Sequence, residues 1–131
     1  MATPRVRTAR IRSFRDLEAW QLAVANALLL YRLTVRFPRH EIFGLTSQLR
    51  RAGVSVAANI AEGHARRDLG DYLRHLSFAR ASVAEIETLL EVALGLRYLP
   101  HVDGNRAIAD AQRLARIVSG LSRSLRALRS R

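Results

Sequence analysis

The sequence contains no cysteine and no lysine, and it has only three prolines and seven glycines among 131 residues. The lack of cysteine excludes a disulfide framework and thiolate chemistry, and it fits a reducing compartment. So few turn-forming residues argue against a β-rich fold. Aromatic residues make up 6% of a chain that is 49% hydrophobic, so the core must consist mostly of leucine, valine, isoleucine and alanine. These shortages favour an all-α protein, and the length fits one domain.

Long hydrophobic runs are also missing. The longest, residues 22–31, contains Asn26 and is half the length of about 20 residues that a transmembrane helix needs. Residues 1–13 lack the apolar segment of a secretory signal. Their arginine-rich, acid-free composition resembles that of a mitochondrial transit peptide, but we expect a cytoplasmic protein with no membrane partner.

Catalytic and metal-binding patterns are absent as well. The nearest two of the four histidines are 11 residues apart and have no cysteine companion. No nucleotide-binding or nucleophile-elbow motif occurs, and no Glu-x-x-His pair suggests a di-iron bundle. Glu62, His64 and Asp68 lie close in sequence, but a solvated helix end explains them better than acid–base catalysis. We therefore predict a protein that is not an enzyme and has no metal or other cofactor.

The positive charge is gathered at the two ends of the chain. All 22 basic residues are arginine, against 11 acids. Residues 1–15 hold five arginines and residues 111–131 hold six, both without an acid, whereas residues 16–110 sum to zero. An arginine-rich genome explains the choice of arginine over lysine. Charge that served solubility alone would be scattered among acids, so the placement suggests a polyanionic partner.

Four segments have the apolar periodicity of amphipathic helices, namely residues 13–36, 45–63, 68–98 and 104–128. Short loops between long helices imply antiparallel neighbours and an up-down-up-down four-helix bundle over residues 13–128. Residues 1–12 are expected to form a flexible basic arm, and residues 129–131 a frayed basic tail.

Several residues predict where these helices begin and end. Ser13 with Asp16 three residues later has the pattern of a capping box. Asp68 and Asp103 are the candidate N-caps of the third and fourth helices. Gly63 is the candidate C′ residue of the second helix.

The first and third helices each carry two apolar stripes where a simple bundle needs one. The main stripes are Leu17, Trp20, Val24, Leu28, Tyr31 and Val35 in the first, and Tyr72, Leu76, Ala79, Val83, Ile86, Leu90 and Leu94 in the third. The second stripes are Leu22, Leu29 and Leu33, then Phe78, Leu89, Val92 and Leu96. A wide core face would account for the second stripes, and so would burial against another copy of the chain.

The second helix carries a narrow polar stripe among small and apolar residues, formed by Gln48, Arg51, Ser55, Asn59 and Glu62. Three interpretations are open: a solvated edge, a hydrogen-bonded network within or between bundles, or a contact with a ligand or nucleic acid. Serine and asparagine are poor residues in mid-helix, and a solvated edge more often carries lysine and glutamate. We therefore favour the network.

Three stretches of the chain have a recognisable pattern. They are FRDLEAWQLA at residues 14–23, YRLTVRFPRHEIFGLTSQLRRAGVSVAANIAEG at residues 31–63, and SFARASVAEIETLLEVA at residues 77–93. The chain thereby resembles the four-helix bundle proteins encoded in 23S rRNA intervening sequences, whose most distinctive run, R-A-x-x-S-x-x-x-N-I-A-E-G, is matched over residues 51–63. The fourth helix is only generically similar, and the arginine-rich ends lie outside the pattern.

The resemblance implies a left-handed four-helix bundle from bacteria, commonly assembled as a ring of five, with no assigned enzymatic activity. It also implies a role with RNA or DNA, from the genetic context and the basic surfaces of the family. Related bundles serve as accessory proteins of diversity-generating reverse transcriptases and bind nucleic acid. This sequence has no clear match to that branch, so the retroelement role is not carried over.

We therefore expect a non-catalytic homo-oligomer, a pentamer by resemblance, that binds RNA or DNA through arginine contacts to phosphate. The candidate contacts are Arg5, Arg7, Arg10, Arg12, Arg113, Arg116 and Arg123. The alternative is a structural scaffold whose ring binds a protein partner and whose arginine-rich ends serve solubility.

Overall fold

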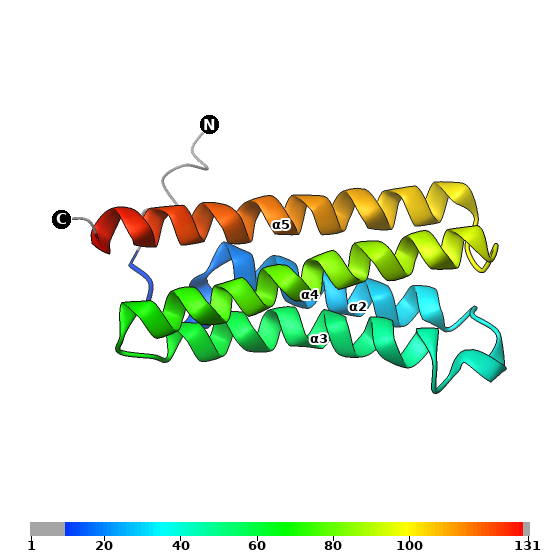
Figure 1. The fold of residues 1–131 in the computed structure, drawn as a ribbon, viewed down its shortest axis with the longest axis horizontal. Helices are drawn as coiled ribbons and strands as arrows, with labels where there is room; N and C mark the ends of the chain where they lie inside the picture. Colours follow the sequence, from blue (N-terminus) through cyan, green and yellow to red (C-terminus); the bar gives the residue numbers. More distant parts are fainter. Residues whose placement is uncertain (1–9, 130–131) are drawn as a thin grey trace.

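The computed structural model describes residues 10–129, and every regular element in that range is a helix. The long helices are α2 (Glu18–Thr34), α3 (Leu45–His64), α4 (Leu69–Gly95) and α5 (His101–Arg129) (Figure 1). A 3-10 helix, η1 (Phe14–Asp16), precedes α2, and another, η2 (Arg39–Glu41), lies in the α2–α3 connection. The all-α, four-helix prediction is confirmed. In the described part of the chain, no helix is both long and apolar enough to span a bilayer.

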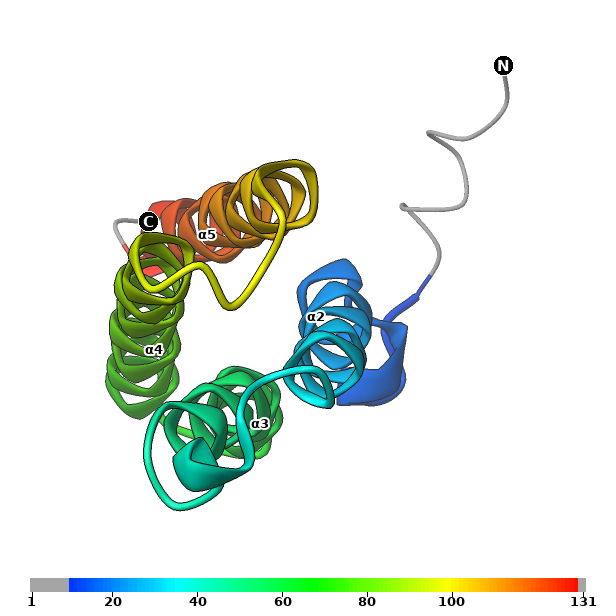
Figure 2. The ribbon, with the colours of Figure 1, turned by 90° about the vertical axis from the view of Figure 1, so that its right-hand side faces the viewer.

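The four helices pack in sequence order around one core. α2 packs on α3, α3 on α4 and α4 on α5, and α5 returns to α2 (Figure 2). Hydrogen bonds join Ser55 to Ser82 and Asn59 to His75, so residue numbers rise along α3 as they fall along the facing part of α4. The α3–α4 pair is therefore antiparallel, as the short connection between these helices requires.

Two of the predicted caps are confirmed. Ser13 and Asp16 form a capping box, although the extended backbone of Leu17 separates that turn from α2, so α2 begins at Glu18. Asp68 caps α4 by accepting a hydrogen bond from the backbone of Asp71 at 3.0 Å.

The prediction for Asp103 is wrong. α5 begins two residues earlier, at His101, so Asp103 lies inside its first turn. The Asp103 carboxylate instead pairs at 3.4 Å with Arg36, which follows α2. This ion pair links the start of α5 to the end of α2.

The prediction that Gly63 ends α3 is also wrong. Gly63 is buried within the helix, and its backbone is not left-handed. A Cβ atom at Gly63 would lie 2.9 Å from the Tyr72 ring and 3.0 Å from Cβ of His75. A Cβ atom at Gly53 would lie 3.3 Å from Cα of Ala27. The two glycines therefore allow α4 and α2 to approach α3 closely.

The main stripe predicted for the third helix is confirmed, because Leu76, Val83 and Leu90 are fully buried. The stripe predicted for the first helix is confirmed at its start and wrong in its second half. Leu17 is buried and Trp20 packs against the core, whereas Leu28 and Val35 are 52% and 74% exposed. The core face of α2 consists mainly of smaller residues, with these buried members: Ala19, Ala23, Asn26, Ala27, Leu30 and Thr34. Small side chains let α2 approach its neighbours, which turns the bulkier residues outward.

The second stripes divide into two groups. Half-buried members that pack against the core are Leu22, Leu29, Leu33 and Leu89. Exposed members are Phe78 at 49%, Val92 at 45% and Leu96 at 52%. A wide core face therefore accounts for the first group but leaves three apolar side chains of α4 uncovered in the monomer.

Glu41 joins the two connections at one end of the bundle. One carboxylate oxygen accepts from the backbone N–H of Leu45 at 3.0 Å, and the other accepts from the Tyr98 hydroxyl at 2.8 Å. Glu41 thus supplies the cap that Gly44, at the N-cap position of α3, cannot provide. The Leu45 N–H, and then the Tyr98 hydroxyl, hold the pKa of Glu41 below its ordinary value of 4.5.

We expect Glu41→Gln to flatten the acid limb of the stability curve. The unfolded carboxyl takes up a proton near pH 4.5, whereas the folded carboxyl resists, so the unfolded chain binds more protons just below this pH. Stability is therefore present above this range and is lost as the pH falls through the folded pKa. Urea unfolding across a pH series measures the effect. Glu91→Gln, an exposed change on α4, is the control, and equal slopes for both variants would contradict the assignment.

Candidate functional site

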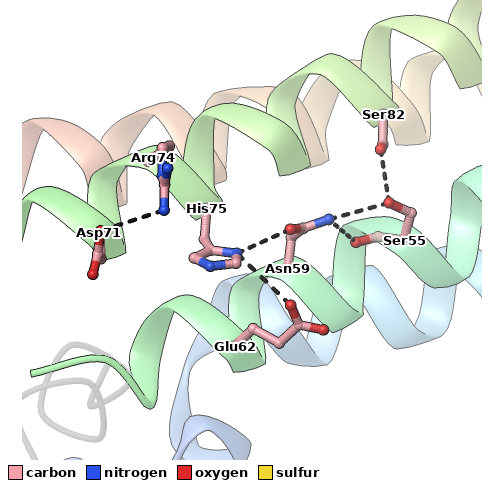
Figure 3. Close-up of polar contacts among 7 residues, drawn as sticks. All are labelled: Ser55, Asn59, Glu62, Asp71, Arg74, His75 and Ser82. Carbon is pink, nitrogen blue, oxygen red and sulfur yellow. Dashed lines mark hydrogen bonds and ion pairs between the residues drawn. The ribbon is translucent and has the colours of Figure 1, made fainter.

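Part of the α3 polar stripe faces α4 and forms hydrogen bonds with it (Figure 3). The Ser55 and Ser82 hydroxyl oxygens lie 3.0 Å apart. The Asn59 amide nitrogen donates to the backbone oxygen of Ser55 at 2.9 Å and to its hydroxyl at 3.1 Å. Nδ1 of His75 lies 3.1 Å from the Asn59 amide oxygen. Four side chains thus form one chain of hydrogen bonds between the two helices.

The geometry defines which atoms donate. The backbone oxygen of Ser55 can only accept, so the Asn59 nitrogen must face it and the Asn59 oxygen must face His75. Nδ1 of His75 therefore carries the hydrogen in this bond. His75 is 7% exposed, and loss of the Asn59 oxygen would leave a buried donor without this acceptor.

The other three stripe residues lie at or beyond the edge of this network. The exposed Glu62 carboxylate is 3.8 Å from Nδ1 of His75, close enough for an electrostatic contact but not for a hydrogen bond. Gln48 and Arg51 are exposed and make no side-chain hydrogen bond with any residue that the structure describes. They line an open groove of about 600 Å³ beside Ser55.

His75 and Ser82, the partners of the stripe, are not among the site residues predicted from the sequence. They lie seven residues apart on α4, on the face that also carries Phe78 and Leu89, so they are the polar members of the second stripe. A search for apolar periodicity passes over them. Both could be identified by their helical spacing with Phe78 and Leu89, once α3 and α4 are paired as antiparallel neighbours.

We expect Asn59→Leu to lower the free energy of unfolding by about 1–3 kcal/mol, because it removes three hydrogen bonds and leaves the buried His75 donor unpaired. Chemical denaturation measures the change. Gln48→Leu, on the same stripe but exposed and unbonded, is the matched control and should change stability little. Unchanged stability in Asn59→Leu with a loss of nucleic-acid affinity would make the stripe a contact surface instead.

The candidate nucleic-acid contacts fall into two groups. Arg5 and Arg7 lie outside the described residues. Arg10 is exposed, but Arg12 has its guanidinium 3.8 Å from the Asp16 carboxylate, which also accepts from the Arg12 backbone at 2.8 Å. Arg12 thus contacts the capping box, and the flexible arm expected over residues 1–12 stays a prediction, because residues 1–9 lie outside the described residues.

The other group lies on α5, where Arg113, Arg116 and Arg123 are all exposed. Arg116 and Arg123 border hollows between α5 and α4, whereas Arg113 lines none of the grooves described here. Arg80 of α4 lines the same hollows from the opposite wall. Arg80 is not among the contacts predicted from the sequence, because it belongs to the part of the chain whose charges sum to zero.

The described residues that line these hollows are rich in hydroxyl groups and include no carboxylate. Two adjoining spaces of about 400 and 370 Å³ share Arg80, Ser119 and Arg123. Ser122 lines the larger space, and Arg116 the smaller. The hydroxyls of Ser119 and Ser122 make no hydrogen bond within residues 10–129. We call this arginine- and serine-lined region the polar groove.

A second groove, of about 690 Å³, lies on the other side of Arg116 and Arg123, between α5 and the start of α2. Its walls are mainly apolar, with Leu17, Ile117 and Leu121 among them. We call it the apolar groove. Elsewhere in the described part of the chain, no three histidine, aspartate or glutamate side chains are grouped so that they could hold a metal ion.

Comparisons with known proteins add a family and a structural neighbour. The family model described as 23S rRNA-intervening sequence protein matches residues 15–120. A crystal structure of a protein of unknown function, from the S23 ribosomal protein family of Bacteroides thetaiotaomicron VPI-5482, is similar at 20% identity and a TM-score of 0.72. The match covers 79% of this chain and 97% of that one, and at this identity it shows the fold alone. No curated protein matches the chain.

Proposed function

The chain belongs to the 23S rRNA-intervening sequence protein family, and on this premise we propose that it is a non-catalytic, homo-oligomeric bundle that binds RNA or DNA. The proposal places it in the bacterial cytoplasm. Its affinity comes from arginine contacts to phosphate, which are independent of base sequence.

The observation that carries the proposal is the exposure of Arg116 and Arg123 on α5 without an ion-pair partner among the described residues. Arg12, Arg36 and Arg74 are each paired with an aspartate. By contrast, Arg116 and Arg123 make no ion pair with any described residue, and no acid is among the described residues that line the polar groove beside them. Guanidinium groups without a carboxylate partner are available to phosphate, for which their planar forks are well suited.

The salt dependence of binding tests this function. We expect log affinity for a mixed-sequence single strand to fall linearly with log salt, with about 0.7 of slope per phosphate contact. Changing Arg113, Arg116 and Arg123 together to glutamine should reduce the slope by up to about 2 and weaken all sequences alike.

The control removes three charges elsewhere, at Arg32, Arg97 and Arg106, which are exposed and outside the grooves around α5. Equal effects of the two triple variants would mean that net charge alone is responsible. If the intact protein binds neither RNA nor DNA at low salt, the proposed function is wrong.

The exposed apolar residues of α4 support the proposal of self-assembly. Phe78, Val92 and Leu96 lie on one face of the helix and are about half exposed. Burial of such side chains in an interface is favourable at about 25 cal/mol per Å² of apolar surface, before the cost of association. The number of copies, five, is carried over from the family resemblance.

We expect sedimentation equilibrium at micromolar concentration to show an oligomer, and Val92→Glu to dissociate it by placing a charge in the interface. Val54→Glu on α3 is the matched control, because Val54 is 48% exposed and Val92 45%. A monomeric wild-type chain would contradict the assembly. Dissociation by Val54→Glu alone would assign the interface to a different face.

A structural scaffold is the second candidate function. Phe43, Ile42 and Val102 are exposed near the end of the bundle where Glu41 joins the two connections, with Phe43 at 94%. An apolar end of this kind suits a protein partner. An oligomer that fails to bind nucleic acid would favour this function.

A further inference from the structure

We propose that the polar and apolar grooves together form a site for single-stranded RNA or DNA, with a phosphate in the polar groove and an unpaired base in the apolar groove. This inference rests on the proposed function and narrows it to a ligand class and a location. Arg116 and Arg123 stand between the two grooves and line both of them.

The polar groove has the donors that a phosphate requires. Arg80 reaches it from α4, and Arg116 and Arg123 reach it from α5, so an anion would be contacted from both walls. Arg116, Ser119 and Arg123 are spaced at i, i+3 and i+7, which puts them on one face of α5. The Ser119 hydroxyl has no hydrogen bond within the described chain and is available as a further donor. Arginine and serine are among the side chains that contact phosphate oxygens in protein–nucleic acid complexes.

The apolar groove suits the face of a base rather than a second phosphate. Leu17, Ile117 and Leu121 give it walls that cannot donate hydrogen bonds to an anion. Guanidinium planes stack on bases, so Arg116 and Arg123 can serve either groove. Glu18 is the one acid among the described residues of this lining, and it would repel phosphate from the apolar side. The phosphate backbone of the nucleic acid is thereby directed toward the polar groove, which Arg80 lines.

This arrangement distinguishes an unpaired strand from a duplex. Inside a duplex the faces of the bases are stacked on one another and only their edges are accessible. A single strand can turn a base outward while its phosphate stays in place, which is how proteins commonly recognise single-stranded RNA. The apolar groove therefore contributes to binding only when bases are unpaired.

Gly120 provides a test that leaves every charge in place. It lines the apolar groove, and a Cβ atom there would meet only the Arg123 guanidinium, at 3.7 Å. Gly120→Leu should therefore fit the helix and fill part of the groove. Because glycine is a poor residue in mid-helix, the change should raise helix stability rather than lower it. Gly95→Leu, where an added Cβ has nothing within 4 Å, is the matched control in another helix.

Fluorescence anisotropy would compare a mixed-sequence single strand, as RNA and as DNA, with the corresponding duplexes. For the wild type we expect tighter binding of single strands. Gly120→Leu should weaken single-strand binding about five- to tenfold, as expected for the loss of a favourable base contact, and leave duplex binding unchanged. Gly95→Leu should change neither. Equal loss for single strand and duplex, or no loss, would overturn the base site.

The phosphate part of the site has its own pair of variants. Arg80→Gln should reduce the single-strand salt slope by about 0.7, whereas Arg106→Gln, exposed on α5 but outside the grooves, should reduce it less. Equal effects would overturn the location while leaving nucleic-acid binding intact. A wild type that binds no nucleic acid would instead show that the proposed function itself is wrong.

Discussion

The close approach of α3 to its two neighbours is the constraint on which the rest of the structure depends. Gly53 allows α2 to pack closely, because a Cβ atom there would crowd Ala27. Gly63 allows α4 to pack closely, because a Cβ atom there would crowd Tyr72 and His75. At this separation the short side chains of Ser55 and Asn59 can span the space between α3 and α4. Longer polar side chains would be needed between helices packed at an ordinary distance. The hydrogen-bonded network is therefore a consequence of the glycines as much as of the polar residues.

The same constraint explains which parts of the fold the sequence predicts. Capping chemistry is local, so Ser13 and Asp68 were recognisable from a few neighbouring residues. The core face of α4 consists of large aliphatic side chains at helical spacing and was found directly. The core face of α2 is different, because Ala23 and Ala27 are buried by close packing rather than by their size. Periodicity based on bulky residues follows the wrong face in such a helix.

The candidate site divides in a similar way. Arg113, Arg116 and Arg123 are candidate contacts from the sequence alone, and all three are exposed because the helical repeat of α5 places them away from its buried residues. Three further residues belong to the candidate sites only because they lie beside residues of another helix, namely Arg80, His75 and Ser82. The pairing of α4 with α5 brings Arg80 to Ser119, and the pairing of α3 with α4 brings His75 to Asn59. Such pairings depend on register between helices, which the pattern of a single segment does not contain.

The most distinctive stretch of the chain, residues 51–63, is explained largely by packing. Ile60 is fully buried, Gly63 makes room for α4, and Ser55 and Asn59 bond across the same contact. The residues that carry the resemblance to the family therefore explain the helix packing rather than ligand binding. The arginine surface lies mostly elsewhere, and Arg123 falls beyond the matched residues 15–120. Residues 51–63, which carry the resemblance to the family, pack α3 against its neighbours. Arg116 and Arg123 of α5, in contrast, are exposed and available to a ligand.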